Sequence, residues 1–107
     1  MYKLVVCSFD NTLIDSEEVI PTSTALLFDK LRSDNIKIVI TTGRCLKSVL
    51  DYNRDFPICD YLVTSNGAYI YDVIKQDVIF KKNIGIRTIK KIIKEFYDKA
   101  SIYLINN

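Results

Sequence analysis

Short β-branched segments alternate with helical segments along the first part of this 107-residue chain. The apolar runs KLVVCSF (3–9), KIVIT (37–41) and YLVT (61–64) are typical of buried strands. Residues 21–33 and 45–54 between them have helical spacing, and Pro57 ends the second segment. Strand, helix, strand, helix, strand is the pattern of a parallel sheet with right-handed crossovers. The sequence therefore predicts an α/β fold with a partial doubly wound, Rossmann-like parallel sheet.

A different pattern follows Gly67. The strand-like runs 68–72 and 77–80 flank a polar turn and predict an antiparallel hairpin, and residues 85–99 and 101–105 predict a helix and a last strand. We expect a first unit at 1–72 and a second, partial α/β segment at 73–107. Three parallel strands alone leave sheet edges uncovered, so we also expect something to pair with them.

The composition limits the cellular compartment of the protein and the side chains available for catalysis and metal binding. The chain has no histidine, which removes the commonest general base and metal ligand. Its three cysteines are odd in number and lack CxxC spacing, which favours a reducing compartment over a disulfide framework or zinc site. Neither an 18-residue apolar run nor a signal peptide is present. We expect a cytoplasmic protein without a membrane partner.

The charge is unevenly distributed along the chain. Residues 1–72 carry 7 basic and 10 acidic side chains, whereas residues 73–107 carry 8 and 3. A basic segment can indicate nucleic-acid binding. Here Lys90, Lys91 and Lys94 lie opposite the apolar stripe of the predicted helix, where a solvated face is expected. The pattern therefore predicts no nucleic-acid partner.

Each predicted parallel strand runs into a polar cluster. The clusters are 8–12, 41–44 and 65–67. Any one of them resembles an ordinary turn, because Asn, Asp, Ser, Thr and Gly are common there. Ligands of open parallel sheets, however, bind beyond the carboxyl ends of the strands. Hydroxyls, an amide, backbone N–H groups and the Asp10 carboxylate at one edge suit a phosphate with a hard cation.

These clusters carry a family resemblance. The ordered segments SFDNTL, IVITTGR and TSNGAYIYD resemble the N-terminal portion of the haloacid dehalogenase (HAD) superfamily, specifically its Cof-type sugar-phosphate phosphatases. Members carry D-x-D-G-T-L after the first strand, A-T-G-R after the second and N-G-A before an inserted cap. The resemblance spans essentially the whole chain and implies a Mg²⁺-dependent phosphate monoester hydrolase acting on a small phosphorylated metabolite.

The resemblance also implies roles for individual residues. Asp10 matches the general acid and base, which also gives a ligand to Mg²⁺, and Ser8 occupies the nucleophile position. The remaining matches are expected to bind phosphate or shape its loops. They are Asn11, Thr12, Thr42, Gly43, Arg44, Asn66 and Gly67. Residues from about 73 onward match the first part of the cap that selects substrate.

Ser8 is the main departure from the family pattern, because the nucleophile there is an aspartate. An aspartate forms a reactive acyl phosphate and its carboxylate helps to hold Mg²⁺. A serine hydroxyl needs an activating base, and its phosphate ester hydrolyses far more slowly. We therefore expect weak or absent Mg²⁺ binding and little turnover. Asn11 in place of glycine is milder, since asparagine tolerates left-handed backbone.

The family's phosphate-neutralising lysine and acidic metal-binding loop follow the cap, and this sequence stops before either. We therefore expect a truncated or degenerate phosphatase, inactive or weakly active alone, that self-associates or pairs with a missing C-terminal half. The alternative is a non-catalytic phosphate-binding or assembly module. A third possibility is that the reading frame is broken and that the missing lysine and acidic loop are encoded just downstream. A flavodoxin-like fold is the alternative architecture, but the chain has no glycine-rich nucleotide fingerprint.

Overall fold

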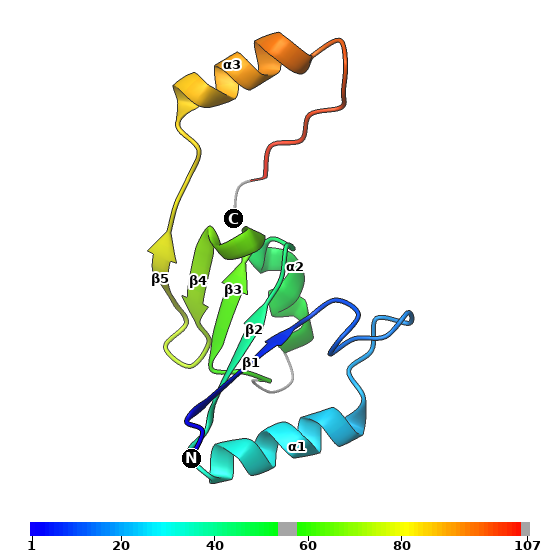
Figure 1. The fold of residues 1–107 in the computed structure, drawn as a ribbon, viewed down its shortest axis with the longest axis vertical. Coiled ribbons are helices and arrows are strands. Elements are labelled where there is room, and N and C mark those ends of the chain that lie inside the picture. Colours follow the sequence, from blue (N-terminus) through cyan, green and yellow to red (C-terminus); the bar gives the residue numbers. More distant parts are fainter. Residues whose placement is uncertain (54–57, 106–107) are drawn as a thin grey trace.

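A computed structural model describes residues 1–53 and 58–105. Within these residues one sheet has five strands in the order β1-β2-β3-β4-β5 (Figure 1). The strands are β1 Leu4–Ser8, β2 Lys37–Thr41, β3 Tyr61–Thr64, β4 Tyr69–Asp72 and β5 Asp77–Lys81. The first three are parallel, whereas β4 and β5 are antiparallel to their neighbours. The predicted α/β fold with a partial parallel sheet is confirmed.

The helices follow the predicted order. They are α1 Thr22–Ser33, α2 Leu46–Leu50 and α3 Ile86–Phe96, with short 3₁₀ turns at Asp51–Asn53 and Ser65–Gly67. Helix α2 is shorter than the predicted 45–54, because the chain tightens into the first of these turns after Leu50. The predicted stop at Pro57 lies outside the described residues. Helix α3 lies apart from the sheet, to which β5 connects it (Figure 1).

The core lies around the middle of the sheet. Fully buried side chains from β2, β3 and α2 meet there with Phe9, which directly follows β1. They include Ile38, Ile40, Val49 and Leu62. Helix α1 adds Phe28, which is 4% exposed. Burial of these branched and aromatic side chains supplies the main driving force for folding this part of the chain.

The register of the parallel strands brings their carboxyl ends together. Ser8 pairs with Thr41, and Thr41 pairs with Val63. Backbone hydrogen bonds continue the pairing past the strand ends, from Phe9 N–H to the Thr41 carbonyl (3.0 Å) and from Thr42 N–H to the Val63 carbonyl (2.9 Å). The polar clusters that follow the three strands therefore lie at one edge of the sheet.

The hairpin was predicted correctly, whereas the last strand was not. Strands β4 and β5 form the predicted antiparallel pair, and Gln76 in the turn has a φ of 56°. Strand β5 also continues the sheet past residue 72, and the domain division expected there stays a prediction. Residues 101–105 form no strand in the structure. Their apolar composition gives strand propensity, but a strand also needs a neighbouring strand to accept its hydrogen bonds.

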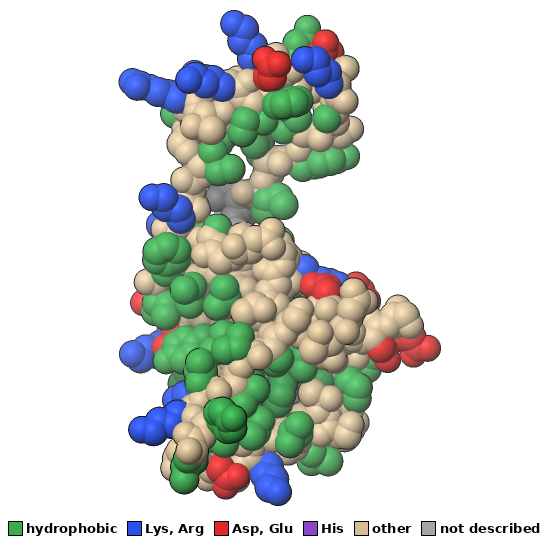
Figure 2. Space-filling view, in the orientation of Figure 1, with side chains coloured by type: hydrophobic (Ala, Val, Ile, Leu, Met, Phe, Trp, Pro, Cys, Tyr) green, Lys and Arg blue, Asp and Glu red, His purple; other side chains and the backbone are tan. Residues whose placement is uncertain are grey.

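Large apolar surfaces remain exposed in the described part of the chain. Strand β1 has Leu4 at 50% and Val6 at 55% exposure, although its sequence is that of a buried strand. All residues of α3 except Ile89 are exposed, and hydrophobic side chains gather beneath this helix and over the sheet (Figure 2). Within the described residues no helix is long and apolar enough to cross a membrane.

Candidate functional site

A cavity of about 370 Å³ opens at the carboxyl ends of the three parallel strands. All three predicted polar clusters contribute to its wall. Its lining residues are Ser8, Thr41, Thr42, Gly43, Val63, Asn66 and Gly67. Five of these seven are residues that the sequence assigned to the site. The cavity lies where ligands of open parallel sheets bind, beyond the carboxyl ends of strands that end in register.

The loops after β2 and β3 are tied together by backbone hydrogen bonds. Ser65 N–H donates to the Arg44 carbonyl at 2.8 Å, and Asn66 N–H donates to the Thr42 carbonyl at 3.2 Å. Ser65, Asn66 and Gly67 all have positive φ angles of 50°, 54° and 92°. This left-handed turn is the conformation that asparagine and glycine tolerate best, and it presents Asn66 to the cavity.

Gly43 allows the close approach of these two loops. A Cβ atom at residue 43 would lie 3.0 Å from the Asn66 Oδ1 atom. Any larger residue would therefore require the Asn66 amide to shift by a few tenths of an ångström. The need for glycine at this position is steric, since its φ is not positive.

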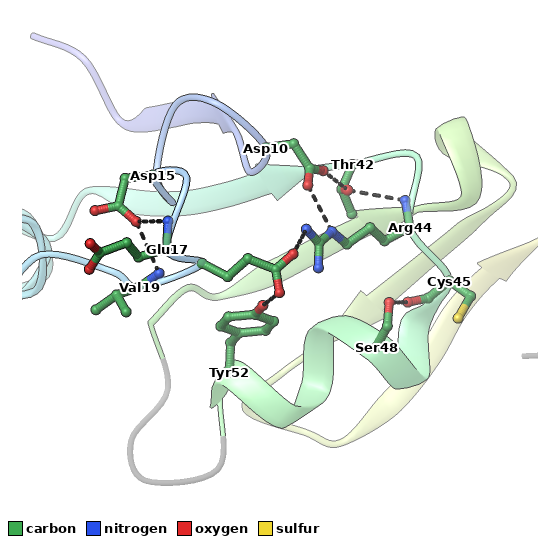
Figure 3. A network of polar contacts seen from close by, with 10 residues as sticks. Asp10, Asp15, Glu17, Val19, Thr42, Arg44, Cys45, Ser48 and Tyr52 are labelled. Carbon is green, nitrogen blue, oxygen red and sulfur yellow. Dashed lines mark hydrogen bonds and ion pairs between the residues drawn. The ribbon is translucent and has the colours of Figure 1, made fainter.

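Asp10 lies beside the cavity with both carboxylate oxygens engaged (Figure 3). Its Oδ2 accepts a hydrogen bond from the Thr42 hydroxyl at 2.8 Å, and its Oδ1 accepts one from Arg44 Nε at 2.7 Å. The Thr42 bond, with help from Arg44, holds the pKa of Asp10 below its usual value. The carboxylate is therefore ionised at neutral pH.

Thr42 makes a second contact through the same hydroxyl. Its Oγ1 accepts a hydrogen bond from Arg44 N–H at 3.1 Å while its proton goes to Asp10. The side chain is 8% exposed, so water replaces these bonds poorly if they are lost. A ligand in the cavity can use the Thr42 proton only after the Asp10 bond breaks, because a hydroxyl has one proton to donate.

Arg44 points away from the cavity wall toward acidic partners. Its Nη2 donates to Glu18 Oε1 at 2.8 Å, and Tyr52 donates its phenolic O–H to Glu18 Oε2 at 3.3 Å. Hydrogen bonds and charge from Glu18, and then from Asp10, raise the pKa of Arg44. The same bond from Arg44 lowers the pKa of Glu18. The predicted phosphate-binding role of Arg44 stays a prediction.

Glu18 and Tyr52 were not predicted as site residues. They lie 26 and 34 positions from their partners Arg44 and Glu18, so no local spacing in the sequence connects them. Neither residue was assigned a role from the sequence, and neither belongs to a motif that could have indicated one.

The Ser8 hydroxyl has a neutral partner. Within the described residues its hydrogen bond goes to the backbone carbonyl of Asp10 at a long 3.5 Å. A carbonyl oxygen is a poor base, so this contact cannot activate the hydroxyl as a nucleophile. The side chain is exposed and forms part of the cavity wall. Ser8 is thus placed where a ligand reaches it, but the partner of its hydroxyl is a carbonyl rather than a base.

Asn11 and Thr12 lie in the turn that follows Asp10. Asn11 has a φ of 56°, the left-handed conformation for which asparagine is the best substitute for glycine. Both residues are exposed, and neither belongs to the cavity wall. The structure therefore gives them a place in the loop, and a direct role in phosphate binding stays a prediction.

The residues that the structure describes do not fit a Mg²⁺ site. They include no group of three or more His, Cys, Asp or Glu side chains that could hold a metal ion. Both Asp10 carboxylate oxygens are already engaged, and the Ser8 hydroxyl and Asp10 carbonyl are neutral. Hard cations favour oxygen ligands that carry negative charge.

Comparison with known proteins identifies the family. The family model for haloacid dehalogenase-like hydrolases matches residues 5–106. The chain belongs to this family. The resemblance in the three polar clusters is thereby confirmed, and HAD-like hydrolases of known structure confirm the fold. A hydrolase from Bacillus subtilis superposes with a TM-score of 0.80 at 20% identity, covering 91% of this chain and 34% of its own.

Related HAD proteins are phosphatases of greater length. A Bacteroides thetaiotaomicron phosphatase of the superfamily has 30% identity and a TM-score of 0.74, and the match covers 91% of this chain and 37% of that one. The HMP-PP phosphatase of Klebsiella pneumoniae is 22% identical over 108 residues, which is 100% of this chain and 39% of the relative. The chain thus spans about two fifths of the length of each of these two relatives.

Proposed function

We propose that this HAD-like chain forms the phosphoryl-binding part of a phosphate monoester hydrolase and has little or no turnover by itself. One observation carries the proposal: Ser8, Thr42, Gly43 and Asn66, from three separate segments, line one cavity beside Asp10. The phosphatase names of its relatives support the reaction class. The substrate would be a small phosphorylated metabolite.

The cavity has the chemistry that an oxyanion needs. Its wall supplies the hydroxyls of Ser8 and Thr42, the amide of Asn66 and the backbone of two glycines. Neutral donors of this kind bind phosphate oxygens without a large desolvation cost. Asp10 beside them is the candidate acid and base, and it would move a proton at its carboxylate after release from Thr42.

Low turnover follows from the chemistry of Ser8. Transfer of a phosphoryl group to Ser8 requires a base to accept the hydroxyl proton, and the hydrogen-bond partner of this hydroxyl is a carbonyl, so a phosphoserine would form slowly. Such an ester would also resist water, unlike an acyl phosphate. We further propose that Mg²⁺ binds weakly or not at all, because the neutral oxygens at this position lack the charge that Mg²⁺ requires.

The test is hydrolysis of a generic phosphate monoester by the purified 107-residue chain with Mg²⁺ present. We expect no turnover above that of the Asp10→Asn variant. Robust turnover that Asp10→Asn abolishes would overturn the proposed inactivity. Calorimetric Mg²⁺ titration of Ser8→Asp against the unaltered chain adds a second measurement, and we expect tighter Mg²⁺ binding by the variant.

A second candidate function is an assembly module, favoured by the outer edge of β1. This strand pairs only with β2 among the described strands, and no charge or proline interrupts Leu4–Ser8. Strand β5, at the other edge, carries Asp77 and Lys81 and adjoins a register shift, which are protective features. Self-association, or pairing with a polypeptide like the rest of the relatives, would cover β1. A monomer by light scattering at all concentrations would count against it.

We also propose a cytoplasmic protein that binds neither nucleic acid nor membranes. The three cysteines are free, which suits a reducing cytoplasm. The sequence places the lysines of α3 opposite its apolar stripe, as in a solvated helix face, and on this ground we propose no nucleic-acid and no membrane partner. Retention of the chain on heparin at physiological salt would contradict the proposal that it has no nucleic-acid partner.

A further inference from the structure

We propose that Glu18 is a positioning residue for Asp10 and acts on it through the Arg44 guanidinium. The inference rests on the proposed function in one respect, namely that Asp10 is the acid and base of the site. The placement of Asp10 by Glu18 and Arg44 can be tested without any turnover. Glu18 fixes one end of the guanidinium, and the other end then holds the carboxylate against Thr42.

The first support is the sharing of one guanidinium by two carboxylates. Arg44 Nε donates to Asp10 Oδ1 at 2.7 Å, and Arg44 Nη2 donates to Glu18 Oε1 at 2.8 Å. The guanidinium is a rigid plane with donors in fixed directions. A bond at Nη2 therefore sets the direction of the Nε–H bond, and through it the orientation of Asp10.

The second support is that Glu18 itself is anchored. Its other oxygen accepts the Tyr52 hydroxyl at 3.3 Å, and the Tyr52 ring packs edge-to-face on Phe9 with centroids 5.0 Å apart. Arg44 lies over both rings, 5.4 Å from the Phe9 centroid and 5.9 Å from that of Tyr52. Phe9 is fully buried, so this aromatic surface is part of the core.

The third support is the loop that carries Glu18. The Asp15 side chain caps it, with Oδ1 accepting from Glu17 N–H at 2.8 Å and from Val19 N–H at 3.4 Å (Figure 3). Glu18 N–H also donates to the Asp15 carbonyl at 3.1 Å, and Glu18 has a φ of 57°. The backbone on both sides of Glu18 is thus bonded, which limits where its carboxylate can go.

If Glu18 acted through its negative charge alone, its variants would behave differently. Glu18 is exposed at 60% of its side chain and Arg44 at 27%, so an ion pair without positional meaning would contribute little. In that case only the negative charge of residue 18 would matter. Reach and charge can be separated, because glutamine keeps the reach of glutamate and aspartate keeps its charge.

The experiment measures Arg44 and Asp10 directly in the full 107-residue chain by NMR near pH 7. The readouts are the exchange rate of the Arg44 Nε–H proton with water and the Asp10 carboxyl ¹³C shift. In Glu18→Ala we expect exchange to become roughly two- to fivefold faster, as for loss of one partly exposed ion pair, and the Asp10 signal to move. Glu17→Ala, which removes a neighbouring charge, is the matched control and should change neither.

The conservative variants decide between position and charge. We expect the Arg44 Nε–H exchange rate and the Asp10 carboxyl shift of Glu18→Gln to be closer to those of the unaltered chain. Those of Glu18→Asp should be closer to those of Glu18→Ala. The reverse order would overturn the proposal, as would unchanged signals in Glu18→Ala. If Glu18→Ala fails to fold, the order of the two conservative variants still decides. Neither readout requires substrate, so a failure here is distinct from a failure of the proposed hydrolase function.

Discussion

Replacement of Thr42 by valine removes the hydroxyl that joins Asp10 to the backbone of the loop after β2. Two hydrogen bonds are lost, one to the Asp10 carboxylate at 2.8 Å and one from Arg44 N–H at 3.1 Å. Valine has nearly the same shape as threonine, so at this buried position the exchange differs mainly in the lost hydroxyl. The change therefore isolates the polar role of Thr42.

The expected loss of stability follows from the two groups that would lose a hydrogen bond, the Asp10 carboxylate and the Arg44 N–H. A charge-assisted hydrogen bond contributes about 1.5–3 kcal/mol and a neutral one about 1 kcal/mol. The Asp10 side chain is 40% exposed, so water replaces part of the lost bond. We expect a loss of about 1–2 kcal/mol in the free energy of unfolding, and a melting temperature lower by about 5–15 °C for a domain of this size.

The loss should also depend on pH. The folded-state pKa of Asp10 is lowered, so its bonds stabilise the protein above the unfolded pKa of about 3.9 and weaken as pH falls through the folded value. Urea unfolding of Thr42→Val and Thr42→Ser at pH 7 and pH 3 is the assay, because serine keeps the hydroxyl. A Thr42→Val variant as stable as Thr42→Ser at pH 7, or a deficit unchanged at pH 3, would refute the reasoning.

Further predictions concern groups around the site and the core. Asn11→Ala should lower stability by about 1 kcal/mol, because alanine is strained at a φ of 56°, and Asn11→Gly should not; urea unfolding measures both. Burial raises the pKa of the Cys59 thiol to about 12, whereas hydrogen bonds from Ser48 lower the pKa of the Cys45 thiol. Iodoacetamide at pH 8 should therefore alkylate Cys45 before Cys59, which peptide mass mapping would detect. Asp60→Asn should cost about 1–2 kcal/mol in urea unfolding at pH 7, because buried Asp60 accepts a 2.8 Å hydrogen bond from Lys37. Burial alone would raise the pKa of Asp60, but its hydrogen bonds lower it, so this contribution should disappear as pH falls through that lowered value.

The sequence predicted the part of the fold that depends on local pattern. The three parallel strands and the hairpin follow from runs of branched apolar residues with polar breaks, and the structure has all of them. Segment 101–105 has the same kind of composition and is no strand, because strand formation there depends on a partner that composition cannot supply. The sequence pattern thus predicts which segments can form strands, whereas a segment joins a sheet only if another strand lies beside it.

The same division applies to the site. Ser8, Thr42 and Asn66 were brought together by one rule, that parallel strands in register end at a common edge, and they line one cavity. The bonds that hold Asp10 and Arg44 in place could not be predicted in this way. Glu18 reaches Arg44 from the loop after Asp10, and Tyr52 reaches Glu18 from the 3₁₀ turn after α2. These contacts depend on tertiary packing such as that of Tyr52 on Phe9, which no local sequence pattern encodes.

The central claim is that this cavity binds a phosphoryl group. The most direct measurement is an NMR titration of the 107-residue chain with inorganic phosphate, followed through backbone amide shifts. The claim predicts saturable shifts at Gly43, Asn66 and Gly67, lost in Thr42→Val and kept in Thr88→Val on the distant helix α3. Shifts confined to the lysines of α3, or no saturable shift at the cavity, would contradict it.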